Sequence, residues 1–302
     1  MKNIAVLNLG LSFLLAPLLP GVINRVKAVF AGRRGRPILQ LYYDILKLLQ
    51  KNVVYSRTVT PLFYIFPIVA VSAIACAGCL VPWAAISVFS FEGDMILFLY
   101  LLGAARFFMV VAALDTGSSF EGMGASREVQ FAVLAEPAFF IALAALARGL
   151  NGLSLKNIYA AIVPQIWAGN GLLLCLSAGA IFLVLLAEAC RVPIDDPDTH
   201  LELTMIHEVM VLDHSGPDLA CILYGAALKM WFLGMLLIGM IFSVHNKSFW
   251  YCEAVLSGGM LGLGVAVGLV ESMMARLRLL KVPLVLLGAA ALAVLAIMVT
   301  VR

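Results

Sequence analysis

Apolar residues along the chain occur in eight long runs that are separated by polar segments. The runs lie near residues 4–20, 62–82, 95–114, 129–147, 171–188, 219–243, 252–271 and 281–301. A helix needs about 20 mostly apolar residues to cross a bilayer. The pattern therefore predicts an all-α polytopic membrane protein with about eight transmembrane helices, organised as a single integral membrane domain over residues 1–302.

The composition supports this prediction. The chain is 63% hydrophobic and 12% charged, whereas an average soluble domain is roughly half apolar and a quarter charged. These values exclude a water-soluble globule and make the lipid bilayer the first expected partner. A net charge of +3 gives no support to nucleic-acid binding.

Lysine and arginine are distributed unevenly between the two sides of the predicted bundle. Thirteen belong to the segments that follow the odd-numbered runs, and five belong to the opposite side, the termini included. Cytoplasmic loops are enriched in these residues. We therefore expect residues 21–61, 115–128, 188–218 and 272–280 to be cytoplasmic, with both termini on the other side of the membrane.

The first of these loops contains a second helical pattern. Between residues 38 and 51, apolar or aromatic side chains recur at helical spacing with charged residues between them: Leu39, Tyr42, Tyr43, Leu46 and Leu49. This pattern predicts an amphipathic helix at the membrane surface. The helix, with Arg33, Arg34 and Arg36 before it, serves either to fix orientation or to dock a peripheral partner.

The third loop is strongly acidic. Eight of the 17 acidic residues lie here: Glu188, Asp195, Asp196, Asp198, Glu202, Glu208, Asp213 and Asp218. Apolar residues alternate with them, so we expect a folded segment with a helix over residues 198–212. Clustered carboxylates near a region of low dielectric constant raise one another's pKa. This behaviour is typical of a proton relay.

No metal site or catalytic centre is predicted in this chain. His200, His207 and His214 recur every seven residues, which separates neighbouring rings by about 10 Å on an ideal helix. The loop at 114–128 is rich in glycine but contains no Gly-Lys-Ser/Thr, so it predicts a tight turn rather than a phosphate site.

Ionisable residues also lie within or at the ends of the apolar runs: Arg106, Glu136, Glu188, Lys229 and Glu271. Charges inside a bilayer are costly and are expected to have partners and functions. Glu188 and Glu271 stand at run ends, where side chains can reach the interface. Pro137 directly follows Glu136 and would loosen the helix there. A buried Glu and Lys can simply pair, or carboxylates can form a path for protons.

Three segments together resemble the subunit 1 family of respiratory complex I, and in particular its hydrogenase branch. They are "EACRVPIDDPDTHLELTMIHEVMVLDHSGPDLA", "LDTGSSFEGMGASREVQFAVLAEPA" and "GRRGRPILQLYYDILKLLQK". That branch includes the membrane subunits of formate hydrogenlyase and of related energy-converting nickel-iron hydrogenases. The resemblance covers nearly the whole chain.

The resemblance implies a subunit that anchors a peripheral electron-transfer arm and connects it to ion-moving membrane subunits. The family's relay would fall on Glu136, Glu188, Arg191, Asp195, Asp198 and Glu202. Docking of the arm would involve Arg33, Arg34, Arg36, Asp115, Arg127 and Glu128. His200 stands where the respiratory branch commonly has an acidic residue.

The implied partners are the hydrogenase large and small subunits, an iron-sulfur subunit and antiporter-like membrane subunits, in the cell inner membrane. The nickel-iron centre and the iron-sulfur clusters would belong to those partners, and this chain would hold no cofactor. A quinone-site subunit is an alternative, although the first loop lacks the paired Gly-Pro pattern of quinone-using relatives. A purely structural anchor is another alternative.

Overall fold

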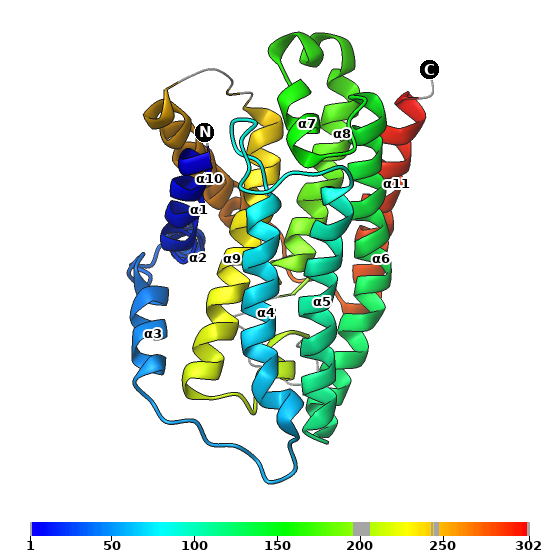
Figure 1. The fold of residues 1–302 in the computed structure, drawn as a ribbon. Coiled ribbons are helices and arrows are strands. Elements are labelled where there is room, and N and C mark those ends of the chain that lie inside the picture. Colours follow the sequence, from blue (N-terminus) through cyan, green and yellow to red (C-terminus); the bar gives the residue numbers. More distant parts are fainter. Residues whose placement is uncertain (1, 196–205, 243, 245–247, 301–302) are drawn as a thin grey trace.

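The computed structural model describes residues 2–195, 206–242, 244 and 248–300, and these residues form a bundle of helices (Figure 1). The α-helices are α1 Lys2–Leu15, α2 Leu18–Phe30, α3 Gln40–Leu49, α4 Pro61–Leu80, α5 Asp94–Asp115, α6 Ser119–Gly149, α7 Leu155–Ala161, α8 Pro164–Glu188, α9 Gly216–Ile241, α10 Phe249–Met273 and α11 Val282–Thr300. Two 3₁₀ turns, η1 Glu208–Val211 and η2 Leu279–Lys281, precede α9 and α11.

Among the described residues, seven helices are long and apolar enough to cross a membrane. The pair α1 and α2 passes the same test together, although it is bent by 44° between Leu15 and Leu18, and it brings the number of spans to eight. This agrees with the number of apolar runs. Both termini lie toward the same end of the bundle (Figure 1), as an even number of spans requires.

Two predicted loops are shorter than the hydropathy pattern indicated. Residues 21–30 continue as α2, which packs against α10, and residues 119–128 form the first turns of α6. Their polar residues are helical because neighbouring elements bury and bind them. Glu121, for example, is fully buried and accepts a hydrogen bond from the backbone N–H of Asp213. Apolar runs therefore underestimate helices that have a buried polar face.

Local sequence signals explain where several helices begin. At α4, the Thr60 hydroxyl accepts a hydrogen bond from the Leu62 N–H, and Pro61 occupies the first helical turn. The Asp115 carboxylate accepts the Thr60 N–H at 2.6 Å, which ties the start of α4 to the end of α5. At α5, Gly93 adopts a left-handed conformation with φ 87°, which glycine tolerates without steric cost.

The amphipathic helix predicted in the first loop is present as α3. It lies beside α9 (Figure 1), and its Tyr42 hydroxyl donates a hydrogen bond to the Leu14 carbonyl at the end of α1. Tyr43, Leu46 and Leu49 are exposed on its outer side. The helix therefore presents an apolar strip to the surroundings while one end is fastened to the N-terminal pair.

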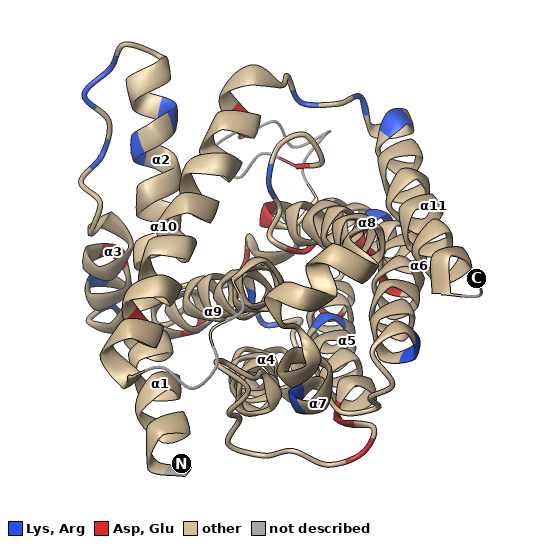
Figure 2. Ribbon diagram, turned by 90° about the horizontal axis from the view of Figure 1, so that it is seen from above, with Lys and Arg blue, Asp and Glu red and all other residues tan. Residues whose placement is uncertain are grey.

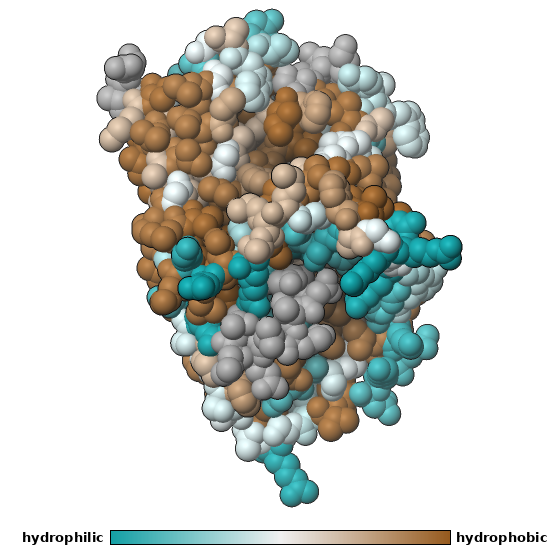
Figure 3. Space-filling view, turned by 180° about the vertical axis from the view of Figure 1, so that it is seen from behind, coloured by the Kyte–Doolittle hydropathy of each residue, from teal (hydrophilic) through white to brown (hydrophobic). Residues whose placement is uncertain are grey.

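Charged residues of both signs lie within the bundle as well as on its surface. Seen from above, charged positions appear between α5, α8 and α9 (Figure 2). On the outer face opposite the view of Figure 1, hydrophobic surface covers the upper part and hydrophilic residues gather in the middle and lower part (Figure 3). The internal charges are the ones that need a physical explanation.

Candidate functional site

Arg106 of α5 is the centre of a buried ion cluster. Its guanidinium forms ion pairs with Glu136 of α6 and Glu188 of α8, and its Nε lies 2.9 Å from Oε1 of Glu128, also in α6. Arg106 is 8% exposed, and Glu128 and Glu188 are 5% and 6% exposed. A planar guanidinium offers five N–H groups in fixed directions, so one arginine can hold three carboxylates from two helices.

Lys229 of α9 completes the cluster from the other side. Its Nζ donates to Oε2 of Glu188 at 3.2 Å, while Oε1 of Glu188 faces Arg106. The deep Lys229 and the interfacial Glu188 therefore pair, and Glu188 bridges two cations. Three carboxylates share two cations in this cluster, so one negative charge is in excess when all three carboxylates are ionised.

A histidine links the cluster to the acidic loop. The Nδ1 of His207 lies 3.4 Å from Oε2 of Glu128, and the backbone N–H of His207 points at Oδ2 of Asp195 at 3.4 Å. Asp195 is 4% exposed and accepts a hydrogen bond from Arg276 at 2.7 Å. Burial lowers the pKa of His207, against the opposing effect of Glu128. The imidazole is therefore held neutral next to a carboxylate.

A second ion cluster lies at the end of α10. Glu271 contacts Lys27 of α2 at 3.1 Å and Arg191 of the acidic loop at 3.5 Å. The side chain of Glu271 is fully buried. Arg191 therefore pairs with Glu271 through its side chain, and its backbone carbonyl accepts a hydrogen bond from the N–H of Asp195, one of the predicted relay carboxylates. This cluster fastens the start of the acidic loop to the α2 and α10 pair.

An apolar cavity of about 240 Å³ borders the Arg106 cluster. Its apolar walls include Phe66, Leu102 and Met109, and Leu41 of α3 lies at its edge. The charged and titratable part of the lining includes Arg106, Glu188, Arg191, Asp195, His207, Glu208 and Lys229. The cavity therefore brings apolar surface and the buried charges into one space.

The residues predicted for docking have different surroundings. Arg33, Arg34 and Arg36 are exposed after α2. Asp115 caps the start of α4, and Arg127 is half-buried beside Met123. Glu128, which was also predicted to take part in docking, is buried in the Arg106 cluster. Of the arginines predicted for docking, the exposed ones are therefore those in the segment that follows α2.

Part of the acidic loop lies outside the described residues, including Asp198, Glu202 and His200. The described end of the predicted helix, residues 206–212, contains the 3₁₀ turn η1 instead of an α-helix. A close approach explains the turn, because the Ile206 carbonyl and Val209 pack directly on Gly124 of α6. That packing places His207 beside Glu128.

Sequence reasoning missed Glu128, Arg276 and Lys27 as members of the ion clusters. Each stands in a polar segment, where a charge is ordinary and gives no signal by itself. Their partners are distant in sequence: Asp195, for instance, is 81 residues from Arg276. Among the described residues, no group of three or more His, Cys, Asp or Glu is arranged to hold a metal ion.

The sequence of this chain matches a known protein family over almost its full length. The family model described as NADH dehydrogenase matches residues 2–301. The chain belongs to this family. The match covers nearly the whole chain, so the similarity to this family is not confined to the three segments quoted above.

Two curated relatives support the hydrogenase branch of the NADH dehydrogenase family. Formate hydrogenlyase subunit 4 of Escherichia coli (strain K12) is 31% identical over 287 residues, which are 88% of this chain and 88% of the relative. Hydrogenase-4 component C of the same organism is 31% identical over 217 residues, 72% of this chain and 67% of that protein. The chain is therefore homologous to membrane subunits of hydrogenase complexes.

A solved structure confirms the fold. A chain of the membrane-bound sulfane sulfur reductase, an archaeal respiratory membrane complex, superposes with a TM-score of 0.85 and covers 98% of each chain at 22% identity. The all-α polytopic fold expected from the apolar runs is thus confirmed. This member of the NADH dehydrogenase family is a multi-pass membrane protein with the same fold as that chain.

Proposed function

We propose that this chain is the membrane-anchoring and coupling subunit of a formate hydrogenlyase-type or energy-converting nickel-iron hydrogenase complex. In this role it links electron transfer in a peripheral arm to proton or ion translocation in the membrane. The observation that carries the proposal is the Arg106 cluster, in which Glu128, Glu136 and Glu188 share Arg106 and Lys229 inside the bundle. Buried charges are costly to hold inside a membrane protein, and such residues by default indicate a functional site.

The cluster can respond to a change of charge in the neighbouring loop. One carboxylate charge is in excess, so binding one proton balances the cluster. Which carboxylate holds that proton depends on the field at Arg106, and Asp195 and His207 lie next to it. An electron arriving in a docked arm changes that field. One pKa unit corresponds to about 1.4 kcal/mol, or a membrane potential of roughly 60 mV acting on one charge.

Glu136 is the outlet of the cluster toward a neighbouring subunit. Its side chain is 52% exposed near the middle of α6, whereas the other two carboxylates are buried. An exposed carboxylate at this depth needs a polar neighbour rather than lipid. Antiporter-like membrane subunits are the partners that would supply it and continue the path.

The peripheral arm would dock on the side of this chain that carries the cationic loops. Arg33, Arg34 and Arg36 form an exposed patch after α2, which complements an acidic protein surface. Hydrogenase large and small subunits and an iron-sulfur subunit would form the arm and hold the nickel-iron centre and the clusters. The excess of lysine and arginine in the loops on this side supports a cytoplasmic location for it, with both termini on the non-cytoplasmic side of the inner membrane.

Amide variants of the two carboxylates test the coupling role. Glu188→Gln and Glu136→Gln keep the side-chain size and remove a titratable group. The complex is expected to assemble and to evolve hydrogen, while proton uptake by inverted vesicles is lost. Glu92→Gln is the matched control, because Glu92 is an exposed glutamate in the loop before α5. Normal proton uptake in both cluster variants would refute the relay.

The same variants separate the alternative functions. A purely structural anchor predicts that both changes weaken assembly and leave the ratio of protons to hydrogen unchanged in the complexes that form. The 240 Å³ apolar cavity beside Arg106 favours a second candidate, a quinone site, since it joins apolar walls to polar groups. Quinone-dependent and inhibitor-sensitive turnover of the purified complex would support that candidate.

A further inference from the structure

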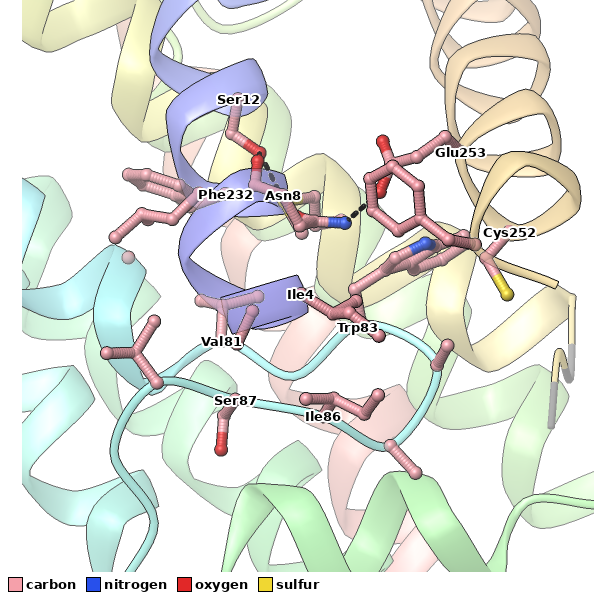
Figure 4. Close-up of a pocket in the computed structure, with 18 residues that line it drawn as sticks. Ile4, Asn8, Ser12, Val81, Trp83, Ile86, Ser87, Phe232, Cys252 and Glu253 are labelled. Atoms are coloured by element: carbon pink, nitrogen blue, oxygen red, sulfur yellow. Dashed lines mark hydrogen bonds between the residues drawn. The ribbon is translucent and has the colours of Figure 1, made fainter. Parts of the chain in front are cut away.

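A second cavity, of about 320 Å³, lies at the end of the bundle away from the Arg106 cluster. Figure 4 shows it between α1, the loop that follows α4, and the start of α10. Helix α10 carries a buried glutamate near each end, Glu253 in this cavity and Glu271 in the cluster with Lys27. They are separated by about 27 Å of helix at about 1.5 Å per residue, so this cavity faces the opposite side of the membrane.

The cavity is lined by a buried carboxyl group that hydrogen-bonds to one side chain among the described residues. Glu253 is 8% exposed, and its Oε1 accepts a hydrogen bond from Nδ2 of Asn8 at 2.5 Å. The amide and the carboxyl point toward each other from α1 and α10 across the cavity (Figure 4). Glu253 itself is one of the residues that line the cavity. Of the described residues that line it, Cys252 and Glu253 are the titratable ones.

An unsatisfied donor faces the same space. Trp83 is 5% exposed, and its indole N–H has no hydrogen-bond partner among the described residues. Figure 4 shows the indole extending from the loop toward Cys252 and Glu253. A buried N–H without an acceptor is costly. Several of the other walls, such as Ile4 and Phe232, are apolar, and the buried hydroxyl of Ser87 in the same lining also has no hydrogen-bond partner among the described residues.

The turn that carries Trp83 is strained. Trp83 and Ile86 exchange two backbone hydrogen bonds, and the residues between them, Ala84 and Ala85, have φ 48° and 61°. A two-residue turn with positive φ at both positions normally uses Asn-Gly or Gly-Gly. Strained backbone persists where the surroundings impose it and is enriched at functional sites. Here the turn carries Trp83, which lines the cavity.

Water would satisfy the polar groups that face this space. A water molecule accepts from an indole N–H and donates to a carboxyl oxygen, whereas a metal ion would leave the indole donor unsatisfied. A cavity holds water when it is polar and has room for at least one probe sphere of about 10–15 Å³. This cavity is many times larger than that minimum, so a chain of waters fits between Trp83 and Glu253.

We propose that this cavity is a hydrated vestibule in which Glu253 exchanges protons with the aqueous phase on the side opposite the Arg106 cluster. The carboxylate takes one proton from a hydronium ion, leaving water, and returns it by the reverse step. No electron moves, and the bonds that form and break are O–H bonds. The use of this step in ion translocation rests on the function proposed above.

Infrared spectroscopy of the purified complex tests proton exchange directly. The C=O stretching band of a protonated carboxyl group is expected to appear as the pH is lowered and to shift within the mixing time in D₂O, because water reaches Glu253. Glu253→Gln should remove this band, and Glu92→Gln should leave it. The inference fails if the band persists in Glu253→Gln or if it does not shift in D₂O.

Vesicle measurements then test the use of the group. Glu253→Gln should lower proton uptake per hydrogen evolved by about tenfold or more, as expected for the loss of a proton-transferring group, and Glu253→Asp should restore much of it. Unchanged uptake in Glu253→Gln, with uptake lost in Glu188→Gln, would overturn this inference and leave the proposed function intact. A D₂O-sensitive Glu253 band together with normal uptake in both Glu188→Gln and Glu136→Gln would overturn the proposed function and leave proton exchange at Glu253 intact.

Discussion

His214 shows what burial does to a single titratable side chain. Its ring stacks on Phe63 with centroids 3.9 Å apart, it is 4% exposed, and neither ring nitrogen has a hydrogen-bond partner among the described residues. Desolvation lowers the pKa of His214 from 6.5 to about 4. Because the folded protein binds this proton more weakly than the unfolded chain, His214 destabilises the fold as the pH falls from 6.5 toward 4.

The size of this effect can be measured with one substitution. At a pH below both pKa values, this pKa shift corresponds to a loss of roughly 3 kcal/mol in the free energy of unfolding. His214→Phe should therefore raise the thermal stability of the purified protein at about pH 5 relative to the parent chain, with a smaller difference at about pH 7. The carboxylates are the same in both proteins, so their effect on stability at acid pH cancels in the difference between the variant and the parent chain. A difference that does not change with pH would show that His214 is not the titrating group.

Some charged residues of the site could be identified from sequence, and others could not. Arg106, Glu136, Glu188 and Lys229 stand out because a charge inside an apolar run is rare and needs a partner. The sequence did not reveal that one guanidinium would join carboxylates from α6 and α8. That arrangement depends on the packing of α5 against its neighbours, which no local pattern records.

Among the helices, boundaries were harder to predict than spans. The apolar runs located α4, α5, α9 and α11 to within a few residues. The beginning of α6 was assigned to a loop because its first ten residues are rich in Gly, Ser and Glu. Gly124 explains this composition, since η1 packs against α6 at this position and leaves no room for a side chain.

Replacing that glycine should separate the two elements. A Cβ at residue 124 would lie 2.4 Å from Cγ1 of Val209 and 2.9 Å from the Ile206 carbonyl oxygen. Gly124→Ala must therefore displace η1 and move His207 away from Glu128. We expect a loss of about 1–3 kcal/mol in stability, as for other overpacked sites, measured by thermal unfolding.

Gly122→Ala provides the control within the same helix turn. A Cβ at that position has its nearest neighbour, Cδ2 of Leu114, at 4.0 Å, which is an ordinary contact. Alanine also has the higher helix propensity, by about 1 kcal/mol. Gly122→Ala should therefore be neutral or stabilising. Equal stabilities of the two variants would mean that η1 does not rest on α6.

For the whole molecule, the outer face of α5 and α6 identifies where a membrane neighbour is needed. Glu136 opens onto this face with its side chain 52% exposed. Around it, Phe107 and Val133 are 62% and 65% exposed, and Phe140 is 44% exposed. In lipid, the carboxylate would lose solvation with only Arg106 to compensate, at a cost of several kcal/mol. A neighbouring subunit that donates a hydrogen bond to Glu136 removes this cost.

A bulky residue on this face should therefore block assembly with the neighbour. Val133→Trp leaves the interior packing of the chain unchanged, because residue 133 points outward. Mild-detergent purification should then recover the peripheral subunits without the adjacent membrane subunit. Leu284→Trp on α11 is the matched control, since Leu284 is also 65% exposed, and it should retain all subunits. If Val133→Trp retains them too, Glu136 faces lipid, and the path from the cluster must leave by another residue.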